Sequence, residues 1–224
     1  MSRLGPFITL AAGAALAAGL GVASITAAPV DQSVATAVPV AEATSTPAAS
    51  AKPSPTRSVR RAVVKADYAG RVRGNGGLIA VSVRNGKAVG YFCDGRTEAW
   101  FAGKVTDGRI ALKGFGDARL TAVLGGRKAK GELVISGREW DFTAPTVKKP
   151  SGLYRATAQV RGARYRAGWI VLPRPDGNGF VQVGAMVKDG VPAPVPTITP
   201  GSPVTIDGSA VTPKDVDEFI EEMP

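Results

Sequence analysis

Short runs of alternating apolar and polar residues fill the chain from about residue 66 to residue 190, and pairs of turn-forming residues separate these runs. Asn85-Gly86 and Asp107-Gly108 are the most specific of these pairs. Alternation with a period of two is typical of β-strands, and Asn-Gly and Asp-Gly favour tight hairpin turns because their residues accept a positive φ. The pattern therefore predicts antiparallel strands joined in series by short turns.

Further junctions of the same kind set the expected number of strands. They lie at Gly125-Gly126, Ser136-Gly137 and Arg161-Gly162. The spacing of these turns predicts about ten strands within residues 66–190, with no helical periodicity between them. We therefore expect an all-β fold, an antiparallel meander of about ten strands that forms a small barrel or a barrel-like sandwich.

The N-terminal residues 1–28 have the pattern of a targeting segment. Arg3 precedes an uncharged run rich in Ala, Gly and Leu. Small residues near Ala27 fit a cleavage site, but the run is also long enough to span a bilayer, which takes about 20 residues. We expect either a cleaved signal peptide or a retained signal anchor. In both cases the domain that follows is extracytoplasmic, secreted or membrane-anchored.

Two segments have too few large apolar residues to form a core of their own. Residues 29–65 are rich in Pro, Ala, Ser and Thr, and we expect them to be a disordered tether. Prolines return in residues 191–211, which we expect to be a linker or a loop that lies along a sheet edge.

Residues 212–224 have the pattern of a short acidic amphipathic helix. Thr212, Pro213 and Asp215 are typical of a capping box with proline at the first helical position. Apolar residues then recur at helical spacing: Val216, Phe219, Ile220 and Met223. So short a helix needs a surface that buries its apolar stripe. We expect it to dock in cis on the basic β domain, with docking on a partner protein and a frayed tail as the alternatives.

Two absences from the composition exclude whole classes of chemistry. The chain contains no histidine, and Cys93 is its only cysteine. Neither a Ser-His-Asp triad nor a Cys-His pair can form, and one thiol cannot build a Cys-rich metal site or an intrachain disulfide. We therefore expect no enzymatic activity, no cofactor and no bound metal.

The most distinctive local pattern is Tyr91-Phe92-Cys93-Asp94-Gly95, followed by Glu98-Ala99-Trp100-Phe101. In this pattern the chain resembles uncharacterised exported or membrane-attached β-domain proteins of actinobacteria, in which a Tyr-x-Cys-Asp-Gly turn and a following Glu-x-Trp recur. The likeness extends from Tyr68 to about Val187 and includes the strand around Trp169. The resemblance implies a β domain of the cell envelope and brings no known function with it.

Five residues of this region are candidates for a ligand site: Cys93, Asp94, Glu98, Trp100 and Trp169. Cys93 ends an apolar strand, and we expect it to face the core as a small hydrophobe. The alternative is a reactive thiol, for which Arg96 is a nearby cation that could stabilise the thiolate. Asp94 is expected to cap the turn before Gly95.

Acidic residues also flank aromatic ones, as a glycoside hydrolase would require. Glu98 lies near Trp100, and Glu139 and Asp141 flank Trp140. Two carboxylates beside aromatic platforms are the usual arrangement for glycoside hydrolysis. Strand alternation, however, predicts that Glu139 and Asp141 face solvent while the aromatic residues face inward. An envelope glycoside hydrolase that uses an acidic pair is therefore an alternative and not the first expectation.

Charge is distributed unevenly along a chain whose net charge is +10. Residues 52–190 contain 26 Lys and Arg against 10 Asp and Glu, whereas residues 204–224 contain one Lys and six acids. A basic field outside the cytoplasm attracts anionic lipid head groups and anionic envelope polymers, and export disfavours nucleic acid as a partner. We expect a non-enzymatic binding or sensing domain at the cell envelope, for anionic ligands. A small-ligand carrier barrel is the other alternative beside the hydrolase.

Overall fold

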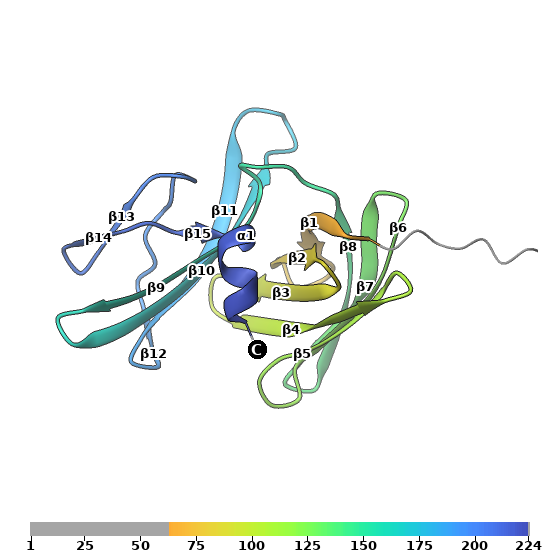
Figure 1. Cartoon of the computed structure of the whole chain (residues 1–224), viewed down its shortest axis with the longest axis horizontal. Helices are drawn as coiled ribbons and strands as arrows, with labels where there is room; N and C mark the ends of the chain where they lie inside the picture. The colour runs from red at the N-terminus through yellow and green to blue at the C-terminus, as the bar shows by residue number, and fades with distance from the viewer. Residues whose placement is uncertain (1–62, 224) are drawn as a thin grey trace, which may run out of the picture. The chain divides into compact units, whose positions relative to one another are not determined.

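The computed structural model describes residues 63–223 (Figure 1). The expected targeting segment, residues 1–28, and all but the last three residues of the expected tether, residues 29–65, lie outside the described part of the chain. Within residues 63–223 no helix is long and apolar enough to cross a membrane.

Eight consecutive strands form a closed antiparallel barrel, so the expectation of an all-β barrel is confirmed. The strands are β1 Lys65–Val72, β2 Leu78–Arg84, β3 Lys87–Cys93, β4 Glu98–Thr106, β5 Arg109–Lys113, β6 Arg119–Gly125, β7 Lys128–Ile135 and β8 Arg138–Pro145. Each strand pairs with the next, and β1 closes the barrel on β8 through the pairs Arg71–Thr143 and Val72–Phe142. Asn85 and Asp107 have φ angles of 48° and 51°, as the predicted hairpin turns require.

Alternate residues of the barrel strands point inward and fill the barrel. Along β5 and β6, buried and exposed positions alternate without a break. The largest fully buried side chains of the interior are Phe92, Phe101, Ile79, Leu112, Leu120, Leu124 and Leu133. Burial of these side chains drives closure of the barrel, because burying one large apolar side chain contributes roughly 1.5–3 kcal/mol to the free energy of folding.

Two inward-facing glycines allow the strands to bend into so small a barrel. A Cβ atom at Gly131 would lie 1.9 Å from the carbonyl oxygen of Thr121, and one at Gly103 would lie 2.6 Å from that of Ala111. Both distances are far below van der Waals contact, and the clashing atoms belong to the backbone. Gly103 and Gly131 are therefore required for the close approach of β4 to β5 and of β6 to β7.

A second sheet follows the barrel, and this is where the structure departs from a single meander of about ten strands. It contains β9 Gly152–Val160, β10 Ala163–Pro173, β11 Phe180–Lys188, β12 Val191–Ala193 and β15 Lys214–Asp215, in the order β12-β11-β10-β9-β15. One of its faces packs on the outside of β1, β2 and β3, where Tyr91 and Cys93 meet Leu153 and Ile170 in a common apolar cluster. The outer face of β1 to β3 is apolar and has to be covered. Strands β1 to β8 therefore close the barrel, and strands of the second sheet form a layer over this face.

The proline-rich segment 191–211 covers the opposite face of this second sheet. It contains β12 and a two-stranded sheet made of β13 Val204–Ile206 and β14 Ser209–Val211. Trp169 Nε1 donates to the carbonyl oxygen of Pro196 at 2.9 Å, and the side-chain amide of Gln182 bonds both backbone groups of Ile198 at 3.0 Å. The segment therefore packs on the sheet along an apolar cluster and contains strands of its own.

The C-terminal helix starts later than the sequence pattern predicts. Lys214 and Asp215 pair with β9, so the chain is still extended where the capping box was expected at Thr212. Asp215 is instead the N-cap of α1 Val216–Phe219, and Glu218 completes the capping box. A 3-10 turn, η1 Ile220–Glu222, follows. Pairing with β9 gives the backbone of these residues hydrogen-bond partners in an extended conformation.

Candidate functional site

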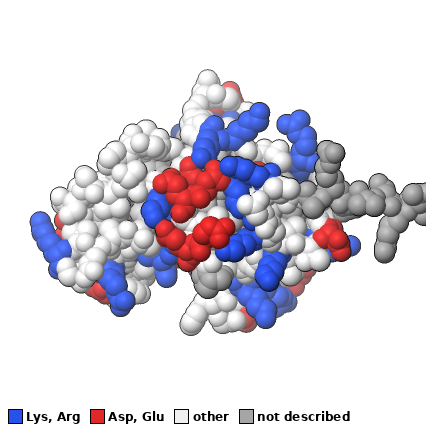
Figure 2. All heavy atoms as spheres, viewed as in Figure 1, with Lys and Arg blue, Asp and Glu red and all other residues white. Residues whose placement is uncertain are grey.

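The acidic residues of the C-terminal segment lie against cations of the β domain (Figure 2). We call residues 214–223 the C-terminal latch. Its apolar residues Val216, Phe219 and Ile220 are at most 3% exposed, and they pack in the cluster between the barrel and the second sheet. The latch therefore contributes both to the apolar core and to the charge balance around it.

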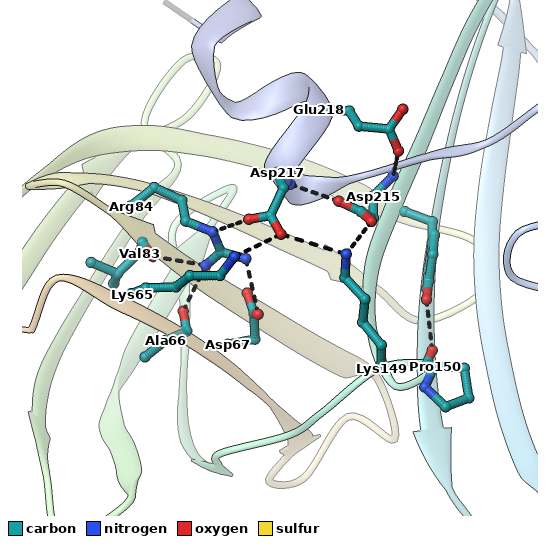
Figure 3. A network of polar contacts seen from close by, with 11 residues as sticks. Lys65, Ala66, Asp67, Val83, Arg84, Lys149, Pro150, Asp215, Asp217 and Glu218 are labelled. Atoms are coloured by element: carbon teal, nitrogen blue, oxygen red, sulfur yellow. Dashed lines mark hydrogen bonds and ion pairs between the residues drawn. The ribbon is translucent and has the colours of Figure 1, made fainter.

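Arg84 is the centre of the ion network under the latch (Figure 3). Its side chain, only 8% exposed, pairs with Asp217 through Nε and with Asp67 through Nη2 at 3.0 Å. Its Nη1 donates to the carbonyl oxygens of Val83 at 2.8 Å and Ala66 at 3.3 Å. A buried guanidinium with all three nitrogens bonded is a structural group and is not available to a ligand.

Lysines complete this network. Lys65 donates to Asp217 at 2.8 Å, and Lys149 pairs with both Asp215 and Asp217. Burial would raise the pKa of Asp217, but the hydrogen bonds from Lys65 and Arg84 outweigh it and hold the pKa well below its usual range. The hydrogen bond to Asp215 raises the pKa of Lys149. Asp217 is therefore ionised whenever the latch is in place at neutral pH.

Three of the five residues predicted for a ligand site, Cys93, Asp94 and Trp169, make contacts that support the fold. Cys93 is fully buried, its Sγ accepts from the backbone N–H of Gly95 at 3.4 Å, and burial raises the pKa of the thiol. Asp94 caps the turn, because its Oδ1 accepts from the N–H groups of Arg96 and Thr97 at 2.8 and 2.7 Å. Trp169 is buried on the other face of the second sheet, in a different apolar cluster from Cys93.

The other two predicted residues, Glu98 and Trp100, line a cleft. Glu98 accepts a hydrogen bond from the Tyr91 hydroxyl at 2.9 Å, and Trp100 packs on Tyr91 with 4.3 Å between ring centroids. Burial raises the pKa of Tyr91, so the hydroxyl stays protonated and holds the carboxylate of Glu98 in place. Phe219 of the C-terminal latch meets the Trp100 ring edge-on at 6.1 Å.

We call this hollow the Trp100 cleft; its volume is about 710 Å³. Its lining includes Glu98, Trp100, Phe115, Arg155, Arg166 and Met223. Sequence reasoning missed Phe115, Arg155 and Arg166. The one signal that could have found Phe115 is its position between two glycines in a turn, and its side chain is 99% exposed. The two arginines come from β9 and β10, and only the packing of the second sheet on β3 brings them to Glu98.

A larger hollow lies on the outside of strands β4 to β8. We call it the barrel groove; its volume is about 840 Å³. Its surface consists of two neighbouring cross-strand rows: Thr106, Arg109, Val123, Lys130 and Thr143, and Lys104, Ala111, Thr121, Glu132 and Asp141. Arg73 and Asp107 also line it. Within residues 63–223, none of the Lys and Arg side chains of the barrel groove has a carboxylate partner within 4.0 Å.

The acids that were considered for glycoside hydrolysis lie in different places. Glu98 lines the Trp100 cleft, whereas Asp141 lines the barrel groove. Glu139 and Asp141 are exposed and Phe142 is buried, so the predicted alternation of β8 is confirmed. Trp140, which the alternation predicts to face inward, packs against Phe92 with 6.4 Å between ring centroids and is not a platform beside the acids. No acid of this set faces Glu98 across the Trp100 cleft.

The fold and its hollows define a class: a closed eight-stranded antiparallel barrel, covered on one side by a second antiparallel sheet and carrying two surface hollows. In the part of the chain that the structure describes, no three Cys, Asp or Glu side chains gather closely enough to hold a metal ion. Comparison of the chain with protein-family models, with curated proteins and with solved structures finds no match.

Proposed function

We propose that the chain is a non-enzymatic binding protein of the cell envelope whose barrel groove binds an anionic, phosphate-bearing polymer. The observation that supports this proposal is the group of unpaired cations at the groove: Arg73, Lys104, Arg109 and Lys130. Exposed cations in a hollow concentrate anions near the surface. The location outside the cytoplasm is part of the proposal and depends on residues 1–28 of the sequence.

The strand register suits a ligand with regularly spaced charges. Arg109 and Lys130 belong to one cross-strand row and are separated in it by Val123. Two steps between neighbouring strands are about 10 Å, so the two cations can meet different phosphates of one chain. In the adjoining row Glu132 and Asp141 are direct cross-strand partners. Carboxylates there can accept hydrogen bonds from polyol or sugar hydroxyls between the phosphates.

The hollow shape favours a polymer over a flat bilayer surface. In one row the long side chains of Arg109 and Lys130 stand on either side of the shorter Val123, and in the other row Lys104 lies next to the small side chains of Ala111 and Thr121. A flexible chain can follow such a surface, but a planar array of head groups meets only its rim. The packed barrel interior gives no support to the carrier alternative, in which a ligand would lie inside the barrel.

The proposal can be tested by binding of poly(glycerol phosphate) to the full chain and to two matched double variants. Arg109→Glu with Lys130→Glu reverses two groove charges, and Arg164→Glu with Arg174→Glu reverses two exposed charges, one on β10 and one in the turn that follows it. We expect the first variant to bind at least about tenfold more weakly, and we expect salt to weaken binding to the wild type. Vesicles of phosphatidylglycerol serve as the planar comparison.

Three outcomes would overturn the proposal. One is an equal loss of affinity in the two double variants, which would mean that only net charge matters. Another is no binding of the polymer at low salt. The third is tighter binding to the vesicles than to the polymer, which would assign the face to a membrane surface.

A further inference from the structure

Arg155 is a largely buried cation whose hydrogen-bonding groups lack close partners in the described part of the chain. Its side chain is 17% exposed, yet it donates no hydrogen bond to any other described residue, and its Nε is buried without a partner. The nearest carboxylate, Glu222, lies 3.7 Å away, beyond hydrogen-bond distance. Its guanidinium lies 5.7 Å from the Trp100 ring centroid and 5.9 Å from that of Phe219. Buried polar groups without partners are rare, so this one calls for an explanation.

The surroundings of Arg155 shield much of its guanidinium from solvent. Desolvation lowers the pKa of its guanidinium. Trp100, whose Nε1 is also buried without a partner, forms the wall beside it. An anion that entered the Trp100 cleft would meet a largely buried cation without a close carboxylate partner, and charge-assisted contacts at such a place are stronger than those at an exposed surface.

The mouth of the cleft adds a second cation and an apolar surface. Arg166, from β10, is 51% exposed and lies 3.9 Å from Glu98, so it remains free to contact a ligand. Phe115 protrudes between Gly114 and Gly116 with nothing packed over its ring. A fully exposed aromatic ring at the edge of a hollow is typical of a surface that a ligand ring covers.

We propose that the Trp100 cleft is a binding site for a small anion that carries an apolar or aromatic ring, with the acidic group at Arg155 and Arg166 and the ring against Phe115. The cleft volume of about 710 Å³ matches a site for one small molecule. The site is separate from the barrel groove, since the two hollows share no lining residue.

Glu222 of the C-terminal latch competes with this ligand. It is the acid nearest to Arg155, and it is held at a distance because its carboxylate also pairs with Lys214 at 2.6 Å. An anion bound in the cleft would therefore replace Glu222 as the partner of Arg155. Removing the charge of Glu222 is expected to tighten binding of the anion, whereas a purely structural role of Arg155 predicts no change in affinity.

The experiment uses anilinonaphthalene sulfonate, a ring-bearing anion, as the probe and follows its fluorescence with the full chain. Arg155 packs in the core and is left unchanged, so the site variants are Phe115→Ser and Arg166→Gln. The matched controls are Phe180→Ser, a partly exposed phenylalanine of β11, and Arg164→Gln, an exposed arginine two residues from Arg166. Circular dichroism melts establish that each variant is folded.

We expect each site variant to bind the probe about five- to tenfold more weakly than the wild type and the controls to bind it as the wild type does. Glu222→Gln should bind it more tightly. Equal affinity in the site variants and the wild type, or an equal loss in the controls, would overturn the proposal. The groove variant Arg109→Glu with Lys130→Glu should bind the probe normally, so failure of the polymer proposal and failure of this one are distinguishable.

Discussion

The surface under the C-terminal latch and the barrel groove are both rich in cations, but the cations of the two regions differ in their partners. Under the latch every cation considered has a carboxylate partner: Lys65, Arg84, Lys87 and Lys149. At the groove none has one within the described residues: Arg73, Lys104, Arg109 and Lys130. The acids of the latch come from one short C-terminal segment, which reaches only one side of the domain.

This difference shows that the net charge of the domain does not by itself locate a binding surface. Cations that face the latch are held by acids of the same chain and contribute to stability, so they are poor ligand contacts. Cations at the groove stay exposed, and they contribute little to stability because solvent screens them. Substitutions should therefore separate the two regions: changes under the latch alter the free energy of unfolding, and changes at the groove alter binding.

The largest effect is expected for the apolar part of the latch. Phe219→Ala removes a ring that is 1% exposed and that contacts Trp100, so it should lower the free energy of unfolding by about 3–5 kcal/mol. Phe115→Ala, at a ring that is 99% exposed, is the control and should change it by less than about 0.5 kcal/mol. Urea denaturation measures both. Similar values for the two variants would show that the latch is not part of the core.

The next effect concerns the buried centre of the ion network. Arg84→Met keeps an apolar chain but removes the partner of Asp67 and Asp217, so it should cost about 3 kcal/mol of unfolding free energy. Arg109→Met at the barrel groove is the control, and it should leave stability unchanged while weakening polymer binding. If Arg109→Met destabilised the protein as much as Arg84→Met, the contrast between the two regions would be wrong.

Much of the barrel could be predicted from the sequence, because its signals are local. Alternation along β5 and β6 and positive φ at Asn85 and Asp107 give strands and hairpins directly. The closure at eight strands could not be predicted. It depends on the apolar outer face of β1 to β3, whose residues Val89 and Tyr91 read in sequence simply as part of one continuous apolar strand.

The candidate site was predicted only in part, for the same reason. Glu98 and Trp100 were found because they lie close to a distinctive turn in the sequence. Arg155 and Arg166 were missed because they are ordinary strand residues until the second sheet packs beside β3. The burial of Cys93 and the turn capping by Asp94 follow the expectation from the sequence, whereas Trp169 lies on the opposite face of the second sheet, away from the site.

The smallest of these effects tests whether the charges of the latch, and not only its apolar stripe, stabilise the protein. The pKa of Asp217 is held below its usual range in the folded state, so its contribution to stability is fully present above the unfolded pKa of about 3.9 and is lost as the pH falls through the folded value. Asp217→Asn should therefore be less stable than the wild type by about 1–2 kcal/mol at pH 7. The difference in the free energy of unfolding between the variant and the wild type should narrow as the pH is lowered from about 5 to 2, because the wild type then loses the same charge. Glu221→Gln is the control, since Glu221 and Lys87 form an exposed pair and such pairs contribute about 0–1 kcal/mol. Urea denaturation of both variants between pH 7 and pH 2 provides the comparison, and a gap for Asp217→Asn that stays constant over that range would mean that its carboxylate stabilises the latch by packing or capping and not by charge.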